Sequence, residues 1–538
     1  MPEPDPKEFI RSNQQKRDDI EDIFKVDSSP HDIEVFKKMI EYLLECNVKT
    51  KRDLQKELAI CRRKYKPVNP KYSDLLGQLR GYQDHRNYET LFNSLITTRV
   101  RSNSGVLVIT VVTSPYPEVD GKKQKFSCEW NCYFCPNERG QPRSYLRDEP
   151  AVIRANANDF DPVMQFMDRA HTMYLKGHKV DKIELIVLGG TFDSYPKQYR
   201  SNFVRDLFYA ANTFADRETR DRKSLEEEQY INESSKTRII GLTLETRPDC
   251  ITVESIEFLR KLGCTRVQLG VQHTCDKILK KINRGCTIAQ VKHAIMLLKD
   301  ACYKIDIHLM PNLPGASPDI DLQMFDNVLN CPELQVDQWK IYPCEVLPWT
   351  VVKKWYDNKS YIPYSVDDLK QVLKQVKKKV HTWIRLNRVI RDIPSQYIYN
   401  DSVPHMRDEL IKELREEGTP CRCIRCREIG DNEFNISDFK IKKQEYQASG
   451  GLEVQLEFEN GQYLGGYLRL RLPTKYTFDF MKGKAFVREL HVYGRLLPVG
   501  ETENRVQHSG LGSKLLKHAE QIAFDHGYNG MIVIAGIG

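Results

Sequence analysis

The spacing of apolar residues along the chain changes near residue 86 and again near residue 395. Residues 32–46 place apolar side chains at helical spacing, and the first 85 residues have this character throughout. Beyond them, short β-branched runs alternate with amphipathic segments such as 252–263 and 287–302. Strands that alternate with helices predict a parallel β/α sheet, and about six repeats indicate a partial barrel. The predicted strands are residues 105–112, 182–190, 238–246, 264–272, 303–310 and 336–343.

The C-terminal part of the chain has a different pattern. Residues 451–458, 463–472 and 485–494 have the character of antiparallel strands, and a Gly-rich helix start and another short strand follow them. This order predicts a second, smaller α/β domain. The expected fold class is α/β. The expected divisions are a helical basic region at 1–85, a partial parallel barrel at 86–395, a cysteine-rich linker at 396–440 and a small α/β domain at 441–538.

Length and composition exclude several classes of protein. With 538 residues, of which 40% are apolar, the chain can form several domain cores. No apolar run approaches the roughly 18 residues of a membrane span, and charged residues occupy the start where a signal peptide would be apolar. We expect a soluble, intracellular protein of the cytoplasm, with the nucleus as an additional location. Its 15 cysteines are therefore expected to be reduced.

The net charge of +8 is unevenly distributed. Between Lys49 and Arg80 the chain carries ten basic residues against only Asp53, Glu57 and Asp74, and the stretch from Lys370 to Arg391 is also basic. Such blocks attract polyanions by releasing counterions. A solvated helix face at a domain edge is the alternative. The ten are Lys49, Lys51, Arg52, Lys56, Arg62, Arg63, Lys64, Lys66, Lys71 and Arg80.

Three cysteines follow the first predicted barrel strand with the spacing C-x3-C-x2-C. Cys128, Cys132 and Cys135 can each bind one iron of a four-iron cluster and leave the fourth iron open for a small-molecule ligand. Phe134, just before the last cysteine, could pack on a base. The alternatives are a structural zinc site that lacks one ligand, or unliganded buried thiols.

A second cluster lies in the linker. Cys421, Cys423 and Cys426 follow the spacing C-x-C-x2-C, and thiolates this close favour zinc. A structural zinc site needs four ligands, and His405 is the candidate for the fourth. Redox-inert thiols are the alternative.

The segment that begins at Gln507 has the pattern Q-x-x-G-x-G, with Gly510 and Gly512, and leads into a predicted helix. Free backbone N–H groups at a helix N-terminus suit a pyrophosphate, and glycine permits its close approach. An ordinary Gly-rich turn is the alternative.

The first cysteine cluster resembles the signature C-x3-C-x-aromatic-C of the radical S-adenosylmethionine (SAM) superfamily. The resemblance implies a [4Fe–4S] cluster whose open iron chelates SAM. It also implies that Gly189, Gly190 and Thr191, at the end of the next strand, contact the SAM amino group.

Further motifs resemble a narrower family. The segments "LGGTF", "GLTLETRPD", "INRGCT", "LMPNLPG", "CREIG" and "VRELHVYG" follow one another as in the family of the catalytic subunit of Elongator, the tRNA wobble-uridine acetyltransferases, from about residue 95 onward. The resemblance implies a GNAT-like acetyltransferase domain that binds acetyl-CoA. The implied acetyl-CoA contacts are Lys182, Glu489, Leu490, His491, Val492, Gln507, His508, Ser509, Gly510, Leu511 and Gly512.

The resemblance also implies a reaction. A deoxyadenosyl radical takes hydrogen from the acetyl methyl group, the carbon radical adds to C5 of the wobble uridine, and thioester hydrolysis leaves 5-carboxymethyluridine. Glu245, Arg247 and Gln272 lie at ends of predicted strands, where barrel enzymes place catalytic residues, and we assign them to SAM or uridine. Structural salt bridges are the alternative for these three residues.

The expected partner is the tRNA anticodon stem-loop, with other Elongator subunits or a second copy of the chain as further candidates. The resemblance also implies a further segment with a tyrosine pair beyond the position of Gly538, so we expect either a fragment or impaired acetyl-CoA binding. Two alternative functions are a tRNA-binding scaffold with a vestigial acetyltransferase half and a protein lysine acetyltransferase.

Overall fold

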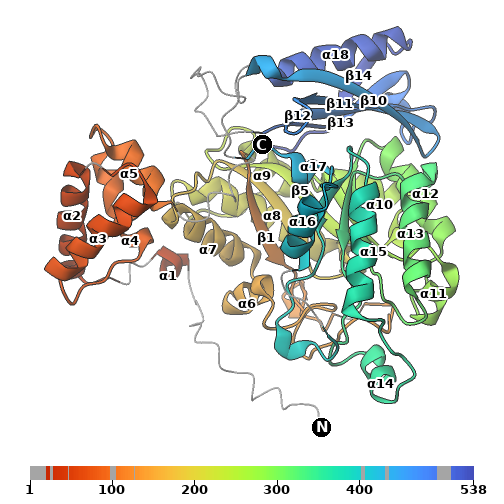
Figure 1. Cartoon of the computed structure of the whole chain (residues 1–538), viewed down its shortest axis with the longest axis horizontal. Coiled ribbons are helices and arrows are strands. Elements are labelled where there is room, and N and C mark those ends of the chain that lie inside the picture. Colours follow the sequence, from red (N-terminus) through yellow and green to blue (C-terminus); the bar gives the residue numbers. More distant parts are fainter. Residues whose placement is uncertain are drawn as a thin grey trace.

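The computed structural model describes residues 20–24, 28–46, 48–96, 105–126, 128–217, 219–401, 406–430, 436–493 and 510–538. They form a helical lobe, a curved parallel sheet covered by helices, and a five-stranded sheet that carries one long helix (Figure 1). None of the described helices combines the length and the apolarity that crossing a bilayer demands.

The helical lobe has its own core and stands to one side of the parallel sheet (Figure 1). Met39, Leu43, Leu58 and Leu75 are all buried in it. The lobe extends to Leu95, beyond the expected boundary at residue 85, because the last helix contributes Leu91 and Leu95 to the same core. Its helices are α2 (Pro30–Glu45), α3 (Lys51–Lys64), α4 (Tyr72–Leu79) and α5 (Tyr88–Leu95), while α1 (Ile20–Phe24) packs on the barrel helix α7.

The basic block of the sequence lies on this lobe. Nine of its ten cations, all but Arg80, are exposed. Arg80 turns inward and its guanidinium stacks on the ring of Tyr174 at 3.6 Å. The outward cations form a solvated positive surface on and around α3.

The parallel sheet has seven strands in the order β1-β4-β5-β6-β7-β8-β9. Six were predicted; the seventh was missed because the short segment "RLNR" has no apolar run. An intervening hairpin pairs β2 (Glu118–Val119) with β3 (Lys122–Lys123). The seven strands are β1 (Leu107–Val112), β4 (Lys182–Leu188), β5 (Arg238–Thr246), β6 (Arg266–Gln272), β7 (Lys304–Leu309), β8 (Gln338–Ile341) and β9 (Arg385–Arg388).

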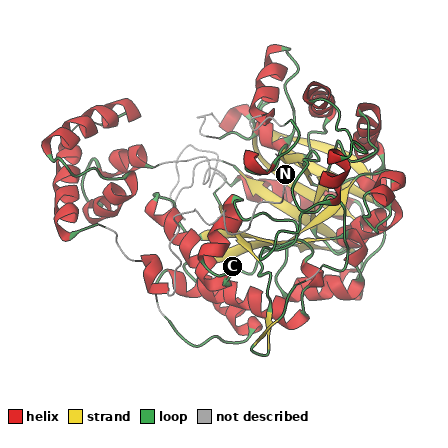
Figure 2. Ribbon diagram, turned by 90° about the horizontal axis from the view of Figure 1, so that it is seen from below, coloured by secondary structure: helices red, strands yellow, loops and turns green. Residues whose placement is uncertain are grey.

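Helices cover the convex face of this sheet, and the sheet curls around a polar interior (Figure 2). The helices of this part of the chain are α6 (Pro150–Ala157), α7 (Pro162–Leu175), α8 (Lys197–Phe214), α9 (Leu225–Asn232), α10 (Val253–Lys261), α11 (Asp276–Lys281), α12 (Ile288–Asp300), α13 (Pro318–Asn330), α14 (Val351–Asp357), α15 (Val366–Lys379), α16 (Met406–Glu416) and α17 (Ile424–Arg427). Short 3-10 turns occur at Arg80–Tyr82, Phe192–Ser194, Pro248–Cys250, Pro332–Leu334, Ser395–Tyr397, Ile436–Asp438 and Asp479–Met481.

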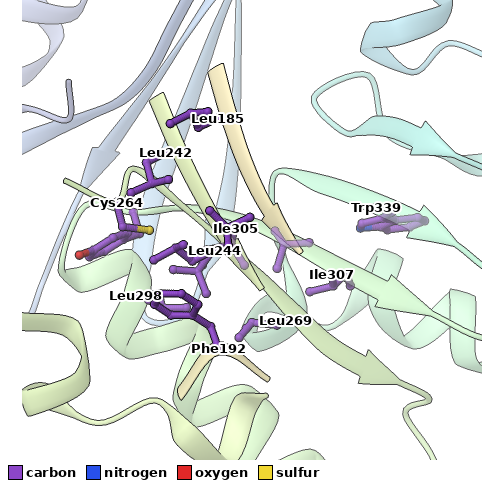
Figure 3. Close-up of a cluster of buried hydrophobic side chains, with 14 of the residues drawn as sticks. Leu185, Phe192, Leu242, Leu244, Cys264, Leu269, Leu298, Ile305, Ile307 and Trp339 are labelled. Carbon is purple, nitrogen blue, oxygen red and sulfur yellow. The ribbon is translucent and has the colours of Figure 1, made fainter. Parts of the chain in front are cut away.

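The two faces of each strand have different roles. In β4, Ile183, Leu185 and Val187 are buried against the helices, while Glu184 and Ile186 line the interior. Leu242, Leu244 and Ile305 join the same apolar layer (Figure 3). Since successive side chains on a strand point to opposite faces, one layer forms the core and the other is left to form a site.

The five-stranded sheet has the order β10-β11-β12-β13-β14, antiparallel except for the parallel pair β13–β14. Helix α18 (Leu511–Asp525) packs on β12 and β13. The sequence predicted every element except β10, an edge strand whose charged residues conceal its pattern. The strands are β10 (Lys440–Ala448), β11 (Gly451–Glu459), β12 (Leu464–Leu472), β13 (Lys484–Val492) and β14 (Gly530–Val533).

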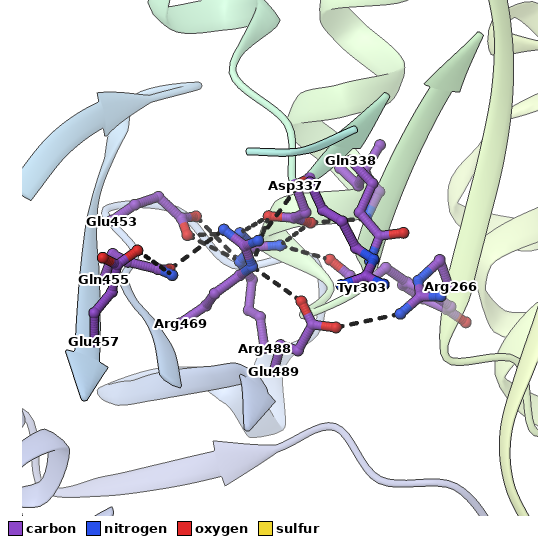
Figure 4. A network of polar contacts seen from close by, with 12 residues as sticks. Arg266, Tyr303, Asp337, Gln338, Glu453, Gln455, Glu457, Arg469, Arg488 and Glu489 are labelled. Atoms are coloured by element: carbon purple, nitrogen blue, oxygen red, sulfur yellow. Dashed lines mark hydrogen bonds and ion pairs between the residues drawn. The ribbon is translucent and has the colours of Figure 1, made fainter. Parts of the chain in front are cut away.

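A buried network of ion pairs joins the two sheets (Figure 4). Arg488 of β13 is fully buried, and its Nη2 lies 2.6 Å from Oδ1 of Asp337 and 2.6 Å from Oε2 of Glu453. Asp337 directly precedes β8, so the pair fixes β13 to the amino ends of the parallel strands.

The network continues along β13. Nε of Arg469 lies 3.0 Å from Glu489, and Glu489 lies 3.2 Å from Arg266 at the start of β6. Burial alone would raise the pKa of Glu489, but Arg469, Arg266 and Lys304 hold it down at about 2. The five-stranded sheet is therefore fixed in register across the amino ends of the barrel strands.

We expect Arg488→Met to lower the free energy of unfolding by about 3–5 kcal/mol, because Asp337 and Glu453 would keep their buried charges without their shortest ion pairs. Urea denaturation measures the loss. The matched control is Lys482→Met, which removes an ion pair to Asp479 between two largely exposed side chains and should cost less than about 1 kcal/mol. An equal loss of unfolding free energy in the two variants would contradict the inference that the network holds the two sheets together.

Candidate active site

The first cysteine cluster lies on a loop at the carboxyl ends of the barrel strands. The backbone N–H of Tyr133 donates to the carbonyl of Ile282 (2.9 Å), and that of Val352 donates to the carbonyl of Tyr133 (3.1 Å). The ring of Tyr133 also packs edge-on against Trp355. The loop is thus attached to the segment after α11 and to the first turn of α14.

Two guanidinium groups point at the sulfur of Cys132. Nη1 of Arg247 lies 3.6 Å from this Sγ and Nη1 of Arg284 lies 3.5 Å from it. Arg247 also pairs with Asp249 and stacks on Trp130 at 4.0 Å. Positive charge here stabilises a thiolate, which is the form that binds iron. Arg247, predicted as a substrate or SAM residue, therefore contacts a candidate cluster ligand and makes the structural salt bridge weighed as its alternative.

The three sulfurs of this loop suit a cluster better than a single ion. In the described part of the chain, only Cys421, Cys423 and Cys426 bring three ligand atoms within 4.8 Å of one another. Ligands on one zinc ion lie that close, since each is about 2.3 Å from the metal. Ligands of a four-iron cluster bind different irons and lie farther apart, which fits the wider spacing of Cys128, Cys132 and Cys135.

The glycine pair after β4 fits tightly against neighbouring backbone. Gly189 has φ of +140°, and a Cβ there would lie 1.7 Å from Oγ1 of Thr113 at the end of β1. A Cβ on Gly190 would lie 3.0 Å from the carbonyl oxygen of Arg143. Thr191 is buried, and its hydroxyl lies 3.8 Å from Sγ of Cys128. The pair therefore presents bare backbone beside the cysteine loop, which suits the SAM amino group.

One cavity of about 860 Å³ runs through the interior of the barrel. Phe134 and Gln272 line its end near the cysteine loop, while Glu489, His491 and Tyr493 line its end at the five-stranded sheet. A single space therefore reaches both of the predicted cofactor sites.

Polar side chains surround the cavity near the cysteine loop. The hydroxyl of Tyr145 donates to Oε2 of Glu245 (2.6 Å), and Nδ1 of His308 lies 3.6 Å from Oε1 of the same carboxylate. Lys340 also lines the cavity and donates to Oε1 of Gln268 (2.7 Å). Burial raises the pKa of Glu245.

Sequence reasoning identified Glu245 and Gln272 but missed Tyr145, His308 and Lys340. The signal for His308 was its place at the end of the predicted strand 303–310. It shares one face of that strand with Lys304 and Asp306.

At the other end of the cavity, part of the backbone of β13 is paired on one side only among the described strands. Its pairing with β14 ends at Val487 and Val533, so Glu489 to Val492 are paired only with β12. Glu489 and His491 face the barrel, while Leu490 and Val492 lie beside Gly512 of α18, which would place a Cβ 3.8–3.9 Å from them. An unpaired stretch of strand backbone suits an extended chain such as pantetheine.

Gly510 caps α18 with φ of +76°, and Leu511 starts the helix. No atom lies within 4 Å of a Cβ built on Gly510, so the helix start is accessible. Gln507, His508 and Ser509 lie outside the described residues.

Lys182 is the first residue of β4 and lies on the same face as Glu184. It is therefore at the end of the barrel that faces the five-stranded sheet, whereas Glu245 and Arg247 lie at the cysteine-loop end. The three residues predicted as catalytic are thus divided between the two ends of the domain.

The second cysteine cluster lies between the two sheets. The N–H of Ile424 donates to the carbonyl of Ile384 just before β9 (3.0 Å). Arg427 bonds to the carbonyl of Thr382 (2.8 Å) and pairs with Glu457 of β11 (2.9 Å). His405 lies outside the described residues, so the fourth ligand stays a prediction.

Comparison with known proteins agrees with this geometry. The chain matches the Radical SAM superfamily over residues 126–321 and the Radical_SAM C-terminal domain over residues 336–416. It is 37% identical to a tRNA uridine(34) acetyltransferase of Methanocaldococcus infernus over 457 residues, covering 82% of this chain and 83% of the relative. The chain belongs to the tRNA uridine(34) acetyltransferase and Elongator complex protein 3 family.

Other relatives extend the match. Elongator complex protein 3 of Saccharomyces cerevisiae is 32% identical over 496 residues, covering 88% of this chain and 86% of that protein. The solved structure of archaeal Methanocaldococcus infernus Elp3 with an N-terminal deletion has a TM-score of 0.68 at 33% identity, covering 81% of this chain and 95% of that one. The family and the radical SAM partial barrel predicted from the motifs are confirmed. Membership of this superfamily implies a [4Fe–4S] cluster and SAM as cofactors.

We expect Gly189→Ala to lower the free energy of unfolding by about 2–6 kcal/mol and to abolish SAM binding, because the added methyl group overlaps Thr113 at an unfavourable φ. Thermal unfolding and isothermal titration with SAM check both effects. The control Gly77→Ala, on α4 with nothing within 4 Å, should be neutral or stabilise by about 1 kcal/mol. Normal SAM binding by the Gly189 variant would contradict the assigned role of the pair.

Proposed function

We propose that this chain forms 5-carboxymethyluridine at the wobble uridine of tRNA from acetyl-CoA, with SAM as the source of the radical. The observation that carries the proposal is the single cavity that reaches both the cysteine loop and the free edge of β13. An acetyl group held at β13 and a radical formed at the cysteine loop need such a shared, enclosed space. The family names of the relatives support the choice of uridine 34 and tRNA.

Different residues would act at the two ends of the cavity, and those at the cysteine loop would hold the cluster and SAM. Cys128, Cys132 and Cys135 would hold the cluster, Arg247 and Arg284 would balance the charge of Cys132, and the glycine pair would receive SAM. When bound, the cluster and SAM supply the one-electron chemistry needed to break an unactivated C–H bond.

The opposite end would bind acetyl-CoA. Backbone groups from Glu489 to Val492 would pair with the pantetheine arm, and the N-terminus of α18 at Gly510 would receive the pyrophosphate. Burial lowers the pKa of His491 to about 4, so its imidazole is neutral at the cavity wall. Lys182 would contact acetyl-CoA from the start of β4.

The outer surface would bind the tRNA. The exposed cations on and around α3 would contact backbone phosphates while the target base turns into the cavity. A tRNA substrate is consistent with the expected cytoplasmic location. Other Elongator subunits or a second copy of this chain are the proposed protein partners.

Anaerobic reconstitution with iron and sulfide, followed by SAM, dithionite, acetyl-CoA and tRNA, tests the proposal. The wild type should release 5′-deoxyadenosine and form 5-carboxymethyluridine, both detected by mass spectrometry. We expect Cys132→Ala to abolish both products and leave tRNA affinity within about twofold, because the cysteine loop lies apart from the phosphate contacts. Cys331→Ser, which replaces a thiol between α13 and the next turn, is the matched control.

Two results would contradict the proposal. A wild type that stays colourless after reconstitution has no cluster. Lysine acetylation without 5′-deoxyadenosine would favour a protein lysine acetyltransferase, and tRNA binding without any product would favour a scaffold.

We further propose that Cys421, Cys423 and Cys426 bind zinc, with His405 as the fourth ligand. Cys423→Ala should remove about one equivalent of zinc and lower the melting temperature, while iron content stays unchanged, because the site connects β9 to β11 through the linker. Elemental analysis of the purified protein measures both metals. Unchanged zinc content would contradict the assignment.

A further inference from the structure

His308 of β7 lines the cavity and has a ring nitrogen without a partner among the described residues. The residue is 6% exposed, and its Nε2 is buried. A buried polar atom without a partner loses its hydration without compensation and therefore calls for an explanation. A ligand that occupies the cavity would supply the missing partner.

The surroundings of the ring determine which nitrogen carries the proton. Nδ1 lies 3.6 Å from Oε1 of Glu245, and catalytic contacts of ligand-free sites are often this long before they tighten. The carboxylate is itself held by the hydroxyl of Tyr145. Glu245 therefore favours the tautomer with hydrogen on Nδ1, which leaves a lone pair on Nε2.

The ring stays neutral and its position is fixed. Burial, together with the positive charges of Lys340, Arg391 and Arg284, lowers the pKa of His308 well below its usual value. Tyr342 packs edge-on against the ring, with centroids 5.5 Å apart. Nε2 is thus an oriented hydrogen-bond acceptor and not a donor.

A second unpaired acceptor lies in the same part of the cavity. Oε1 of Gln272 is buried and has no partner in the described part of the chain, and the residue has φ of +74° at the end of β6. Backbone strain of this kind is concentrated at ligand sites. The cysteine-loop end of the cavity therefore offers acceptors that match a donor on the ligand.

A uracil ring has one such donor, the N3–H group, between two carbonyl acceptors. Cytosine has an acceptor at N3 instead, so an imidazole lone pair in this position would repel it. Lys340 has N–H groups beyond the one used by Gln268 and could serve a uracil carbonyl. The Watson–Crick edge of a base turned into a pocket is read in this way.

We propose that Nε2 of His308 accepts a hydrogen bond from N3–H of the target uracil and makes the enzyme specific for uridine. The assignment rests on the proposed function, because it takes the ligand to be a uridine. Glu245 acts through His308 as a positioning residue.

The test compares anticodon stem-loops that carry uridine or N3-methyluridine at position 34. The full-length reconstituted protein should bind the uridine form more tightly, by about 10–100-fold, because the methylated base cannot donate from N3. His308→Ala should reduce this preference at least about tenfold. His308→Gln, which restores an acceptor, should recover much of it.

Two controls separate recognition from structure. His293→Ala, at an exposed position on α12, should keep the wild-type preference. His293→Ala should also keep the wild-type SAM cleavage in the absence of RNA, since its exposed side chain lies on α12. A merely structural role would weaken both RNAs and SAM cleavage together.

The test of His308 can fail independently of the test of the proposed function. Binding is measured without turnover, so an inactive preparation still tests the recognition. Equal affinity of the wild type for the two RNAs, or an unchanged preference in His308→Ala, overturns the inference even if carboxymethyluridine forms. If His308→Ala fails to fold, the wild-type comparison and His308→Gln decide.

Discussion

The buried ion pairs between Arg488, Asp337 and Glu453 fix the relation between the two sheets, and the site depends on that relation. Charges removed from water carry a large desolvation cost, which only close and well-oriented partners offset. Such pairs contribute less to net stability than to the choice of one arrangement over others. Here the chosen arrangement places the free edge of β13 over the amino ends of the barrel strands, where the cavity opens toward it.

The two ends of the cavity differ in chemical character. At the cysteine loop, guanidinium groups and bare glycine backbone favour anionic sulfur and a polar ligand. At the five-stranded sheet, backbone of β13 that no described strand pairs and the start of α18 form the surface at which we propose that acetyl-CoA binds. Between them lies the polar ring of Tyr145, Glu245 and His308. A base between these ends would be within reach of both cofactors.

Much of the architecture could be predicted from apolar spacing, because strands and helices with one buried face leave a regular pattern. The spacing of apolar residues did not reveal strands that are short or mostly polar. Strand β9 and the edge strand β10 carry mostly polar residues, and neither could be recognised without its neighbours. The core of the helical lobe includes Leu91 and Leu95, which lie beyond the expected division at residue 85 and belong to it by packing alone.

The sequence by itself determined the chemistry that local spacing can carry: two cysteine triplets, the glycine pair and the family to which the chain belongs. Ligands of one site that lie within a few residues of one another need a particular spacing, so the local sequence reveals the site. Tertiary structure alone decided that Arg247 lies against Cys132, that Lys182 and Glu245 lie at opposite ends, and that His308 faces the cavity. These facts depend on how strands distant in the chain are paired and on which face of each strand points inward. A local sequence pattern does not contain that information.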